Sequence, residues 1–396
     1  MIIFATAFAD EGEVRPVPAP AELSAPAELP APPEAHAAKK HKLGGYGLPT
    51  VGGNTTDGFG AGVGGELFSR PIDQEFGYRW KLTLSIWATT RGYVSFFSQF
   101  ERRTAASHDL LRFGVQSWRN LPYSGVGGDM VSVRHGRDAE IGNRIAGPYA
   151  MLAHSHLLRP SLRAYAQLWL HPVWVKPFPG GLLDTLDPYA ARGGAYGDVT
   201  VGLELDTTDR WPMPTAGVRA EVDVRGGGTL AEAAFEPLVG VHTELVTWNE
   251  LERHLVVGTR VIAEKSFGAR PPPEQFVTGG RWRDEIGFEQ ALAGYGRIRP
   301  RGDGLVAGMV EVRPYFFTVG KKWTLDVHAS VFAEMGWLLA KNDPGPPMPT
   351  IGGGPLLLWQ KGSQLRPFVA YGWWSEEVGG ARRPVAQVGL SVTDPL

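Results

Sequence analysis

The chain has 396 residues, of which 39 are Lys or Arg and 41 are Asp or Glu, so its formal net charge is −2. This balance gives no electrostatic footprint for nucleic acid, and we expect no nucleic-acid partner. The chain contains no cysteine, which excludes disulfides, thiolate metal sites and cysteine nucleophiles together.

The first residues resemble the end of a secretion signal. Met1–Phe8 is apolar, and Ala7-Phe8-Ala9 fits the A-x-A pattern at which signal peptides are cleaved. The stretch is shorter than a full signal peptide and lacks its basic start. We interpret residues 1–9 as a signal-peptide remnant; an ordinary apolar N-terminus is the alternative.

Residues 10–43 are rich in Pro, Ala and Glu. Such a composition predicts a disordered, semi-rigid tether, which we place in the periplasm. The segment is too short to hold a folded module of ordinary size.

Beyond the tether, apolar and polar residues alternate over strand-length runs, and no stretch approaches the roughly 20 apolar residues of a transmembrane helix. In Asp198–Asp206, for example, Val199, Val201, Leu203 and Leu205 fall on one face and charged or hydroxyl side chains on the other. Sixteen such runs are predicted as strands: Gly58–Phe68, Arg79–Ala88, Tyr93–Glu101, Asp109–Arg119, Gly147–Leu158, Ser161–Lys176, Asp198–Asp206, Val218–Arg225, Phe235–Thr247, His254–Ser266, Phe276–Arg281, Leu305–Phe316, Trp323–Glu334, Thr350–Trp359, Gln364–Trp374 and Pro384–Val392.

The spacing of these runs decides between two all-β architectures. A soluble antiparallel sandwich has the same period of two, but its strands recur every roughly 8–12 residues. The runs here recur about every twenty, which long strands crossing a bilayer would give. The sequence therefore predicts that residues 44–396 form an all-β, transmembrane, antiparallel β-barrel of about 16 strands.

Tryptophans near turns or strand edges agree with a membrane barrel, whose aromatic girdles lie at the membrane–water interfaces. We expect this role for seven of the thirteen: Trp211, Trp248, Trp282, Trp337, Trp359, Trp373 and Trp374.

Several segments, taken in order, resemble the BamA/TamA-type outer-membrane assembly superfamily, also called the bacterial surface antigen family. Leu292–Tyr295 resembles its loop motif Val/Leu-Arg-Gly-Phe/Tyr, Glu311-Val-Arg313 its strand motif Glu-x-Arg, and Phe332–Gly336 the element aromatic-x-Asp-x-Gly. The resemblance covers roughly Gly44 to the C-terminus. It also rests on Asp206–Asp209 followed by Pro214–Gly217, on Asn120–Gly125, and on Gly45–Gly60, which is similar to the family's first barrel strand.

The resemblance implies a site inside the barrel. The extracellular loop from Arg281 to Gly304 would fold inward and place Leu292, Gly294, Tyr295, Arg297 and Arg299 in the lumen, against the wall residues Glu311, Arg313 and Glu334. The family's loop arginine is Ala293 here. Because an unpaired buried carboxylate is costly, we expect Arg297, Arg299 or Arg301, or water, to replace that partner.

The resemblance further implies a role in outer-membrane protein assembly or transport, with a weak seam between the first and last strands. Its implied partners are outer-membrane lipids and lipopolysaccharide, together with periplasmic chaperones or client proteins. We expect no chaperone-like periplasmic (POTRA) domain ahead of the barrel, and the chain ends without the family's terminal aromatic.

Two other functions stay open: a passive pore for small solutes and, more remotely, an outer-membrane hydrolase. The sequence shows no G-x-S-x-G motif and no catalytic residues. His154 and His156 share a strand face, but no third metal ligand is evident. We therefore expect no enzyme activity, no cofactor and no metal.

Overall fold

The computed structural model describes residues 41–54, 58–71, 78–118, 143–176, 194–209, 213–231, 234–252, 254–268, 304–320, 324–340, 343–344, 347–359, 363–375 and 382–393. These residues form one antiparallel sheet of seventeen strands. None of them lies in a helix long and apolar enough to cross a membrane.

Apart from the two-residue β14, which pairs only with β13, each strand pairs with the next long strand along the chain, so the sheet is a continuous meander. Its strands are β1 (His41–Asn54), β2 (Gly58–Pro71), β3 (Trp80–Thr89), β4 (Val94–Arg103), β5 (Ser107–Trp118), β6 (Asn143–Arg159), β7 (Leu162–Lys176), β8 (Gly194–Asp206), β9 (Gly217–Ala231), β10 (Ala234–Glu252), β11 (Leu255–Gly268), β12 (Gly304–Val319), β13 (Leu325–Ala340), β14 (Asp343–Pro344), β15 (Met348–Trp359), β16 (Ser363–Ser375) and β17 (Arg382–Thr393).

The prediction of about sixteen strands is confirmed, because β14 has only two residues and the other sixteen strands have ten or more. Every predicted run coincides with a strand except Phe276–Arg281, which lies outside the described residues. One part of the prediction is wrong. The segment Gly45–Gly60, taken as part of a single first strand, belongs to two strands, β1 and β2, which pair antiparallel. β1 begins at His41, three residues before the predicted start of the barrel.

The sheet is apolar on the side that is exposed and polar on the side that is buried. On β8, Val199 and Val201 are 49% and 52% exposed, whereas Asp198 and Thr200 are each 8% exposed. Most other strands repeat this pattern. A water-soluble sheet buries its apolar face, so the inverted arrangement indicates a wall whose outer surface contacts hydrocarbon.

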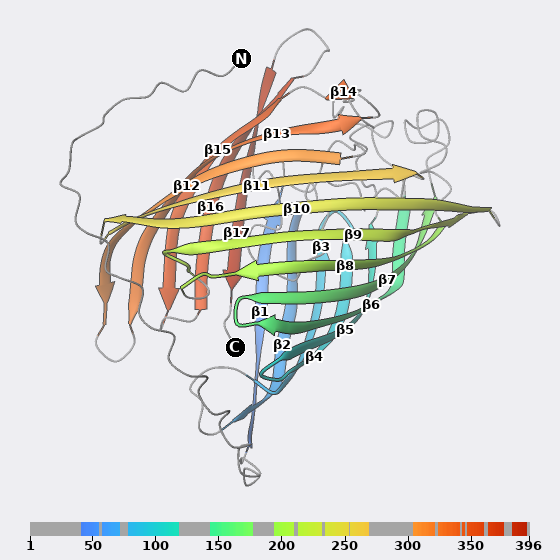
Figure 1. Cartoon of the computed structure of the whole chain (residues 1–396), viewed down its shortest axis with the longest axis horizontal. Coiled ribbons are helices and arrows are strands. Elements are labelled where there is room, and N and C mark those ends of the chain that lie inside the picture. Colours follow the sequence, from blue (N-terminus) through green and yellow to red (C-terminus); the bar gives the residue numbers. More distant parts are fainter. Residues whose placement is uncertain are drawn as a thin grey trace, which may run out of the picture. The chain divides into compact units, whose positions relative to one another are not determined.

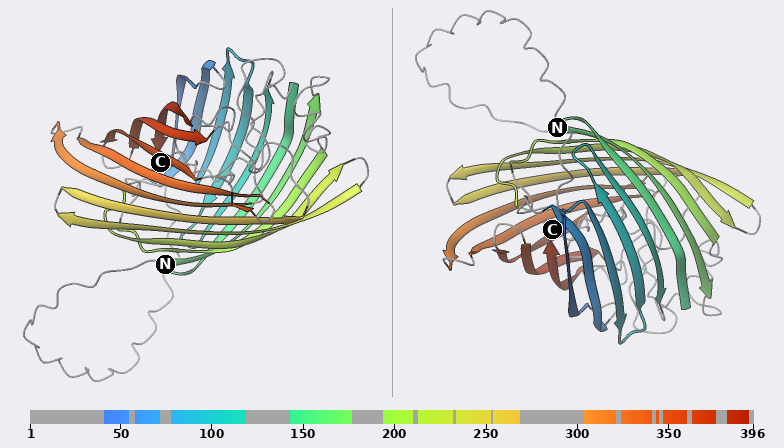
Figure 2. Two further views of the ribbon diagram at one scale, coloured as in Figure 1. Left: turned by 90° about the horizontal axis from the view of Figure 1, so that it is seen from above. Right: turned by 90° about the horizontal axis from the view of Figure 1, so that it is seen from below.

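The sheet curls around on itself (Figures 1 and 2). Both views of Figure 2 show the red C-terminal strands beside the blue N-terminal ones, and Cα atoms of β1 and β17 approach within 8 Å. Within the described part of the chain, no register of paired residues joins β1 to β17. The two end strands therefore meet without the ladder that links every other neighbouring pair.

The connections differ in length between the two ends of the strands. At one end lie all three long connections, residues 119–142, 177–193 and 269–303, and we call it the loop end. At the other end, the turn end, the longest connection is residues 207–216. β1 starts and β17 finishes at the turn end, because the number of long strands is even.

Candidate functional site

Among the described residues, charged and polar side chains of the inner face form networks that join two or more strands, including three that surround Glu311, Glu244 and Glu101. We name them after their central carboxylates: the Glu311 network on β12, β13 and β16, the Glu244 network on β9 to β11, and the Glu101 network on β3 to β5. All three carboxylates are less than a tenth exposed, at 1%, 8% and 4% respectively. Burial of ionised groups is tolerated only where partners satisfy them, and each network supplies such partners.

The Glu311 network contains the wall residues that the sequence analysis singled out. Glu311 and Arg313 lie two residues apart on the inner face of β12, and Arg313 Nη2 lies 2.9 Å from Glu311 Oε2. Glu334 is also on the inner face, on β13, and is 4% exposed. The structure thus places all three predicted residues on one part of the inner wall.

The remaining partners of Glu311 were missed by the sequence analysis. Arg366 on β16 places Nη2 2.7 Å from Glu311 Oε1, and the Ser330 hydroxyl donates a hydrogen bond to the same oxygen. Both carboxylate oxygens of Glu311 are therefore paired by side chains of the wall itself. The strand residues Arg313 and Arg366 thus supply positive charge to Glu311. The expected contact of Arg297, Arg299 or Arg301 stays a prediction, because these three residues lie outside the described part of the chain.

Two aromatic rings support the arginines of this network. The Arg313 guanidinium lies 3.8 Å from the ring centroid of Trp248, and that of Arg366 lies 5.5 Å from the ring centroid of Phe332. Each ring covers a glycine directly opposite it on the next strand: Trp248 covers Gly258 and Phe332 covers Gly352. A Cβ atom at either glycine would collide with the ring, so glycine is what lets the ring lie close against the wall.

This arrangement corrects the expectation for Trp248. It is 9% exposed and faces inward beneath Arg313, so it is not a girdle residue. Trp337 is 38% exposed on the outer face of β13, as a girdle residue would be. The side chains of Trp211, Trp282, Trp359, Trp373 and Trp374 lie outside the described residues.

The Glu244 network links β9, β10 and β11. Glu244 Oε1 lies 2.9 Å from Arg260 Nε and 3.4 Å from Arg219 Nη2. His242, 6% exposed, lies between Glu244 and Glu264, with a ring nitrogen 3.9 Å from an oxygen of each. These contacts tie three successive strands together across the inner face.

The Glu101 network lies toward the turn end of β3 to β5. Glu101 accepts hydrogen bonds from Gln99 Nε2 at 2.8 Å and from the Tyr78 hydroxyl, and it pairs with Lys81 at 3.2 Å and with His108 at 2.9 Å. Tyr78 precedes β3, and its burial raises the pKa of its hydroxyl well above the usual value. That hydroxyl therefore remains a donor at every physiological pH.

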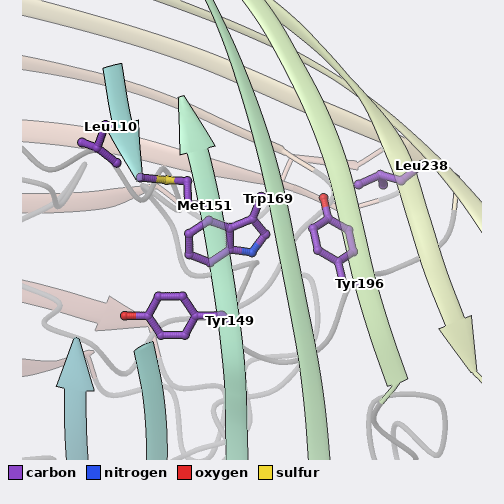
Figure 3. Packing of buried hydrophobic residues seen from close by; sticks show 6 residues of the cluster. All are labelled: Leu110, Tyr149, Met151, Trp169, Tyr196 and Leu238. Atoms are coloured by element: carbon purple, nitrogen blue, oxygen red, sulfur yellow. The ribbon is translucent and has the colours of Figure 1, made fainter. Parts of the chain in front are cut away.

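An apolar patch lies on the inner face between these networks. Tyr149 and Trp169 stack with ring centroids 5.3 Å apart, and Leu110, Met151, Tyr196 and Leu238 complete the cluster (Figure 3). The cluster draws side chains from β5, β6, β7, β8 and β10. The inner wall therefore combines charged networks with a buried, largely aromatic patch.

The predicted loop residues Leu292, Gly294, Tyr295, Arg297 and Arg299 lie outside the described residues. Their place in the lumen stays a prediction. Among the described residues no group of three or more His, Cys, Asp or Glu side chains is arranged to hold a metal ion. His154 is instead on the outer face of β6, with Nδ1 2.7 Å from Asp109 Oδ1.

Together, an apolar outer face, a charged and covered inner face and a curled antiparallel meander define a class of protein, the membrane β-barrel. Neither family models nor curated protein sequences gave a match to the chain. Solved structures do match. BamA from Haemophilus ducreyi lacking POTRA domains 1–3 shares the fold at a TM-score of 0.55 and 12% identity, over 89% of this chain and 70% of that one.

Two further structures agree with this comparison. CdiB from Acinetobacter baumannii matches at a TM-score of 0.55 and 13% identity, over 89% of this chain and 59% of that one. CdiB from Escherichia coli matches at a TM-score of 0.55 and 12% identity, over 88% of this chain and 62% of that one. The chain thus has the fold of the BamA and CdiB outer-membrane barrels and spans about three fifths of the length of the two CdiB chains.

Proposed function

We propose that this chain is a bacterial outer-membrane barrel of the BamA/TamA type that acts in protein assembly or transport at that membrane. The observation that carries the proposal is the Glu311 network. It lies in the strands whose sequence resembles the family's motifs, on the inner wall of a sheet with the same fold as BamA and CdiB. The proposal assigns the chain no catalytic residue and no cofactor.

In this proposal the turn end faces the periplasm and the loop end faces outward, because outer-membrane barrels have short periplasmic turns and longer extracellular loops. Lipids and lipopolysaccharide would contact the apolar outer face. Unfolded client proteins, with or without periplasmic chaperones, would be the partners.

A passive pore is the second candidate, and the polar inner face favours it. The burial of that face speaks against it. Glu311, Asp223 and Arg366 are 1%, 3% and 2% exposed, whereas the wall of an open water-filled channel leaves such groups accessible.

Two measurements test the proposal. First, the protein should be recovered in the outer-membrane fraction and should migrate faster on a gel before boiling than after it; a soluble protein without this shift would refute the barrel itself. Second, the purified protein in lipid vesicles should accelerate the folding of a urea-denatured β-barrel client severalfold over empty vesicles. Steady conductance in planar bilayers without any acceleration would favour the pore.

A loop deletion tests the predicted role of the extracellular loop. Removal of Leu292–Asp303 should lower both the stability of the barrel and the acceleration of client folding, because the loop is expected to dock on the inner wall. If the deletion leaves both quantities unchanged, the predicted role of this loop is wrong.

A further inference from the structure

The connection between β8 and β9 at the turn end is held by its own hydrogen bonds. Asp209 accepts bonds from the Thr215 backbone N–H at 2.8 Å, the Thr215 hydroxyl at 2.6 Å and the Ala216 N–H at 3.1 Å. Thr207 exchanges further bonds with Val218 at the base of the connection. These contacts give the connection a defined shape and direction.

The backbone conformation of Gly217 sets the direction in which the chain enters β9. Its φ is +112°, and a Cβ atom at this position would lie 2.5 Å from the carbonyl oxygen of Thr207. Only glycine adopts this conformation without strain. The described parts of the connection, residues 207–209 and 213–217, are therefore held in one conformation.

That conformation carries Met213 onto the inner face of a distant strand. Met213 is 3% exposed and packs against Leu356 and Leu358 of β15, which are 0% and 5% exposed. Both leucines lie on the inner face, since Thr350 and Leu356 are buried on β15 while Ile351 and Pro355 between them are exposed. The two residues that follow Met213 along the chain, Pro214 and Thr215, are buried as well.

The contact crosses the interior of the sheet. Five ladders separate β9 from β15 along the meander, those between β9, β10, β11, β12, β13 and β15. With strands about 4.8 Å apart, the wall between them is roughly 24 Å wide. Met213 therefore reaches β15 through the space that the curled sheet encloses. Leu358 pairs with Asp326 near the start of β13, which places the contact at the turn end (β8, β9 and β15 are labelled in Figure 1).

We propose that the stretch Met213–Gly217 of this connection is a latch that closes the lumen at the turn end, with Met213 as the residue that packs against Leu356 and Leu358. A thioether against two leucines forms no directional bond, so the contact can release when a competing apolar segment takes the place of Met213. The ends of the connection, held at Asp209 and Gly217, would keep their shape while Met213 leaves. The proposal does not depend on the function above, since it rests only on the packing of Met213 against β15.

The absence of cysteine from the chain makes a direct test available, because one introduced thiol is the only one. The full-length Leu356→Cys protein, in detergent micelles, is exposed to a charged maleimide and its labelling rate is measured. We expect slow labelling with Met213 in place. Adding Met213→Asp should raise the rate at least tenfold, and Met213→Ala should raise it to a smaller extent.

Two controls distinguish release of Met213 from a general loosening of the barrel. Ala105→Asp, in the exposed β4–β5 turn at the same end, should leave the labelling of Leu356→Cys unchanged. Leu238→Cys, a 2% exposed inner-face position on β10 toward the loop end, should stay protected with or without Met213→Asp. Heat-dependent gel mobility confirms that each variant is folded, and Met213→Ala serves if Met213→Asp is not. Equal labelling of Leu356→Cys with and without Met213 would overturn the proposal, and so would exposure of both thiols together.

Discussion

Arg366→Gln tests whether the Glu311 network supports the wall. Removing one member of a buried ion pair costs about 3–5 kcal/mol when the remaining charge has no other partner. Glu311 would keep Arg313 at 2.9 Å, so we expect a smaller loss, about 2–3 kcal/mol. Glu311→Gln should cost more, about 4–5 kcal/mol, because it removes the carboxylate that pairs with both Arg313 and Arg366 and leaves the two guanidinium groups buried close together.

The free energy of unfolding can be measured by denaturant titration of the protein in detergent micelles, with tryptophan fluorescence and the gel shift as independent probes. Arg102→Gln is the matched control. Arg102 makes a contact of the same 2.9 Å length with Asp109, but its side chain is 61% exposed, and we expect a loss below about 1 kcal/mol. The double variant Glu311→Gln/Arg366→Gln should lose less than the sum of the single variants, with a coupling of about 1–2 kcal/mol. Equal losses for Arg366→Gln and Arg102→Gln, or purely additive losses in the double variant, would refute the reasoning.

Three further predictions concern the latch and the outer face. Gly217→Ala should destabilise the protein by about 1–3 kcal/mol because of its positive φ, whereas Gly226→Ala, whose added Cβ would meet nothing within 4 Å, should be close to neutral in the same thermal melts. Burial opposes ionisation of Asp209, but its hydrogen bonds outweigh burial and hold its pKa below the usual 3.8. Its stabilising contribution should thus be complete above pH 3.8 and be lost as the pH falls through the lowered folded pKa; Asp209→Asn should abolish this step in melts recorded across that range, and an unchanged step would contradict it. Val222→Arg on the outer face should cost about 2–4 kcal/mol in lipid vesicles, while Ala105→Arg in an exposed turn should cost almost nothing; similar losses would mean that Val222 does not face lipid.

The fold was predictable because period-two alternation reports directly which residues share a face. β1 escaped prediction because it carries Gly44, Gly45, Gly47, Gly52 and Gly53, which leave no alternation to read. The latch escaped for a different reason. The contact of Met213 with Leu356 depends on how the wall curves, and curvature is set by the whole sheet and not by either segment.

The site was predictable only in part. Glu311, Arg313 and Glu334 stood out through a local motif, and strand parity alone places Glu311 and Arg313 on one face. Arg366 belongs to a strand three ladders away from β12, and no sequence spacing encodes that its side chain reaches Glu311 across a concave surface. Some aromatic rings cover a glycine on the neighbouring strand, as Tyr149 covers Gly114. Such a contact likewise cannot be predicted without knowing the register between the two strands.

The alternation of apolar and polar residues along each strand also determines how apolar the unfolded chain is. An export channel retains segments of roughly 20 consecutive apolar residues as membrane helices. Here many apolar residues of the outer face alternate with polar residues of the inner face, and the mean hydropathy of the chain is only −0.14. The chain thus offers such a channel no segment of that length to retain as a membrane helix. The apolar outer face forms only when the strands pair, because pairing places the apolar and polar side chains on opposite sides of the sheet.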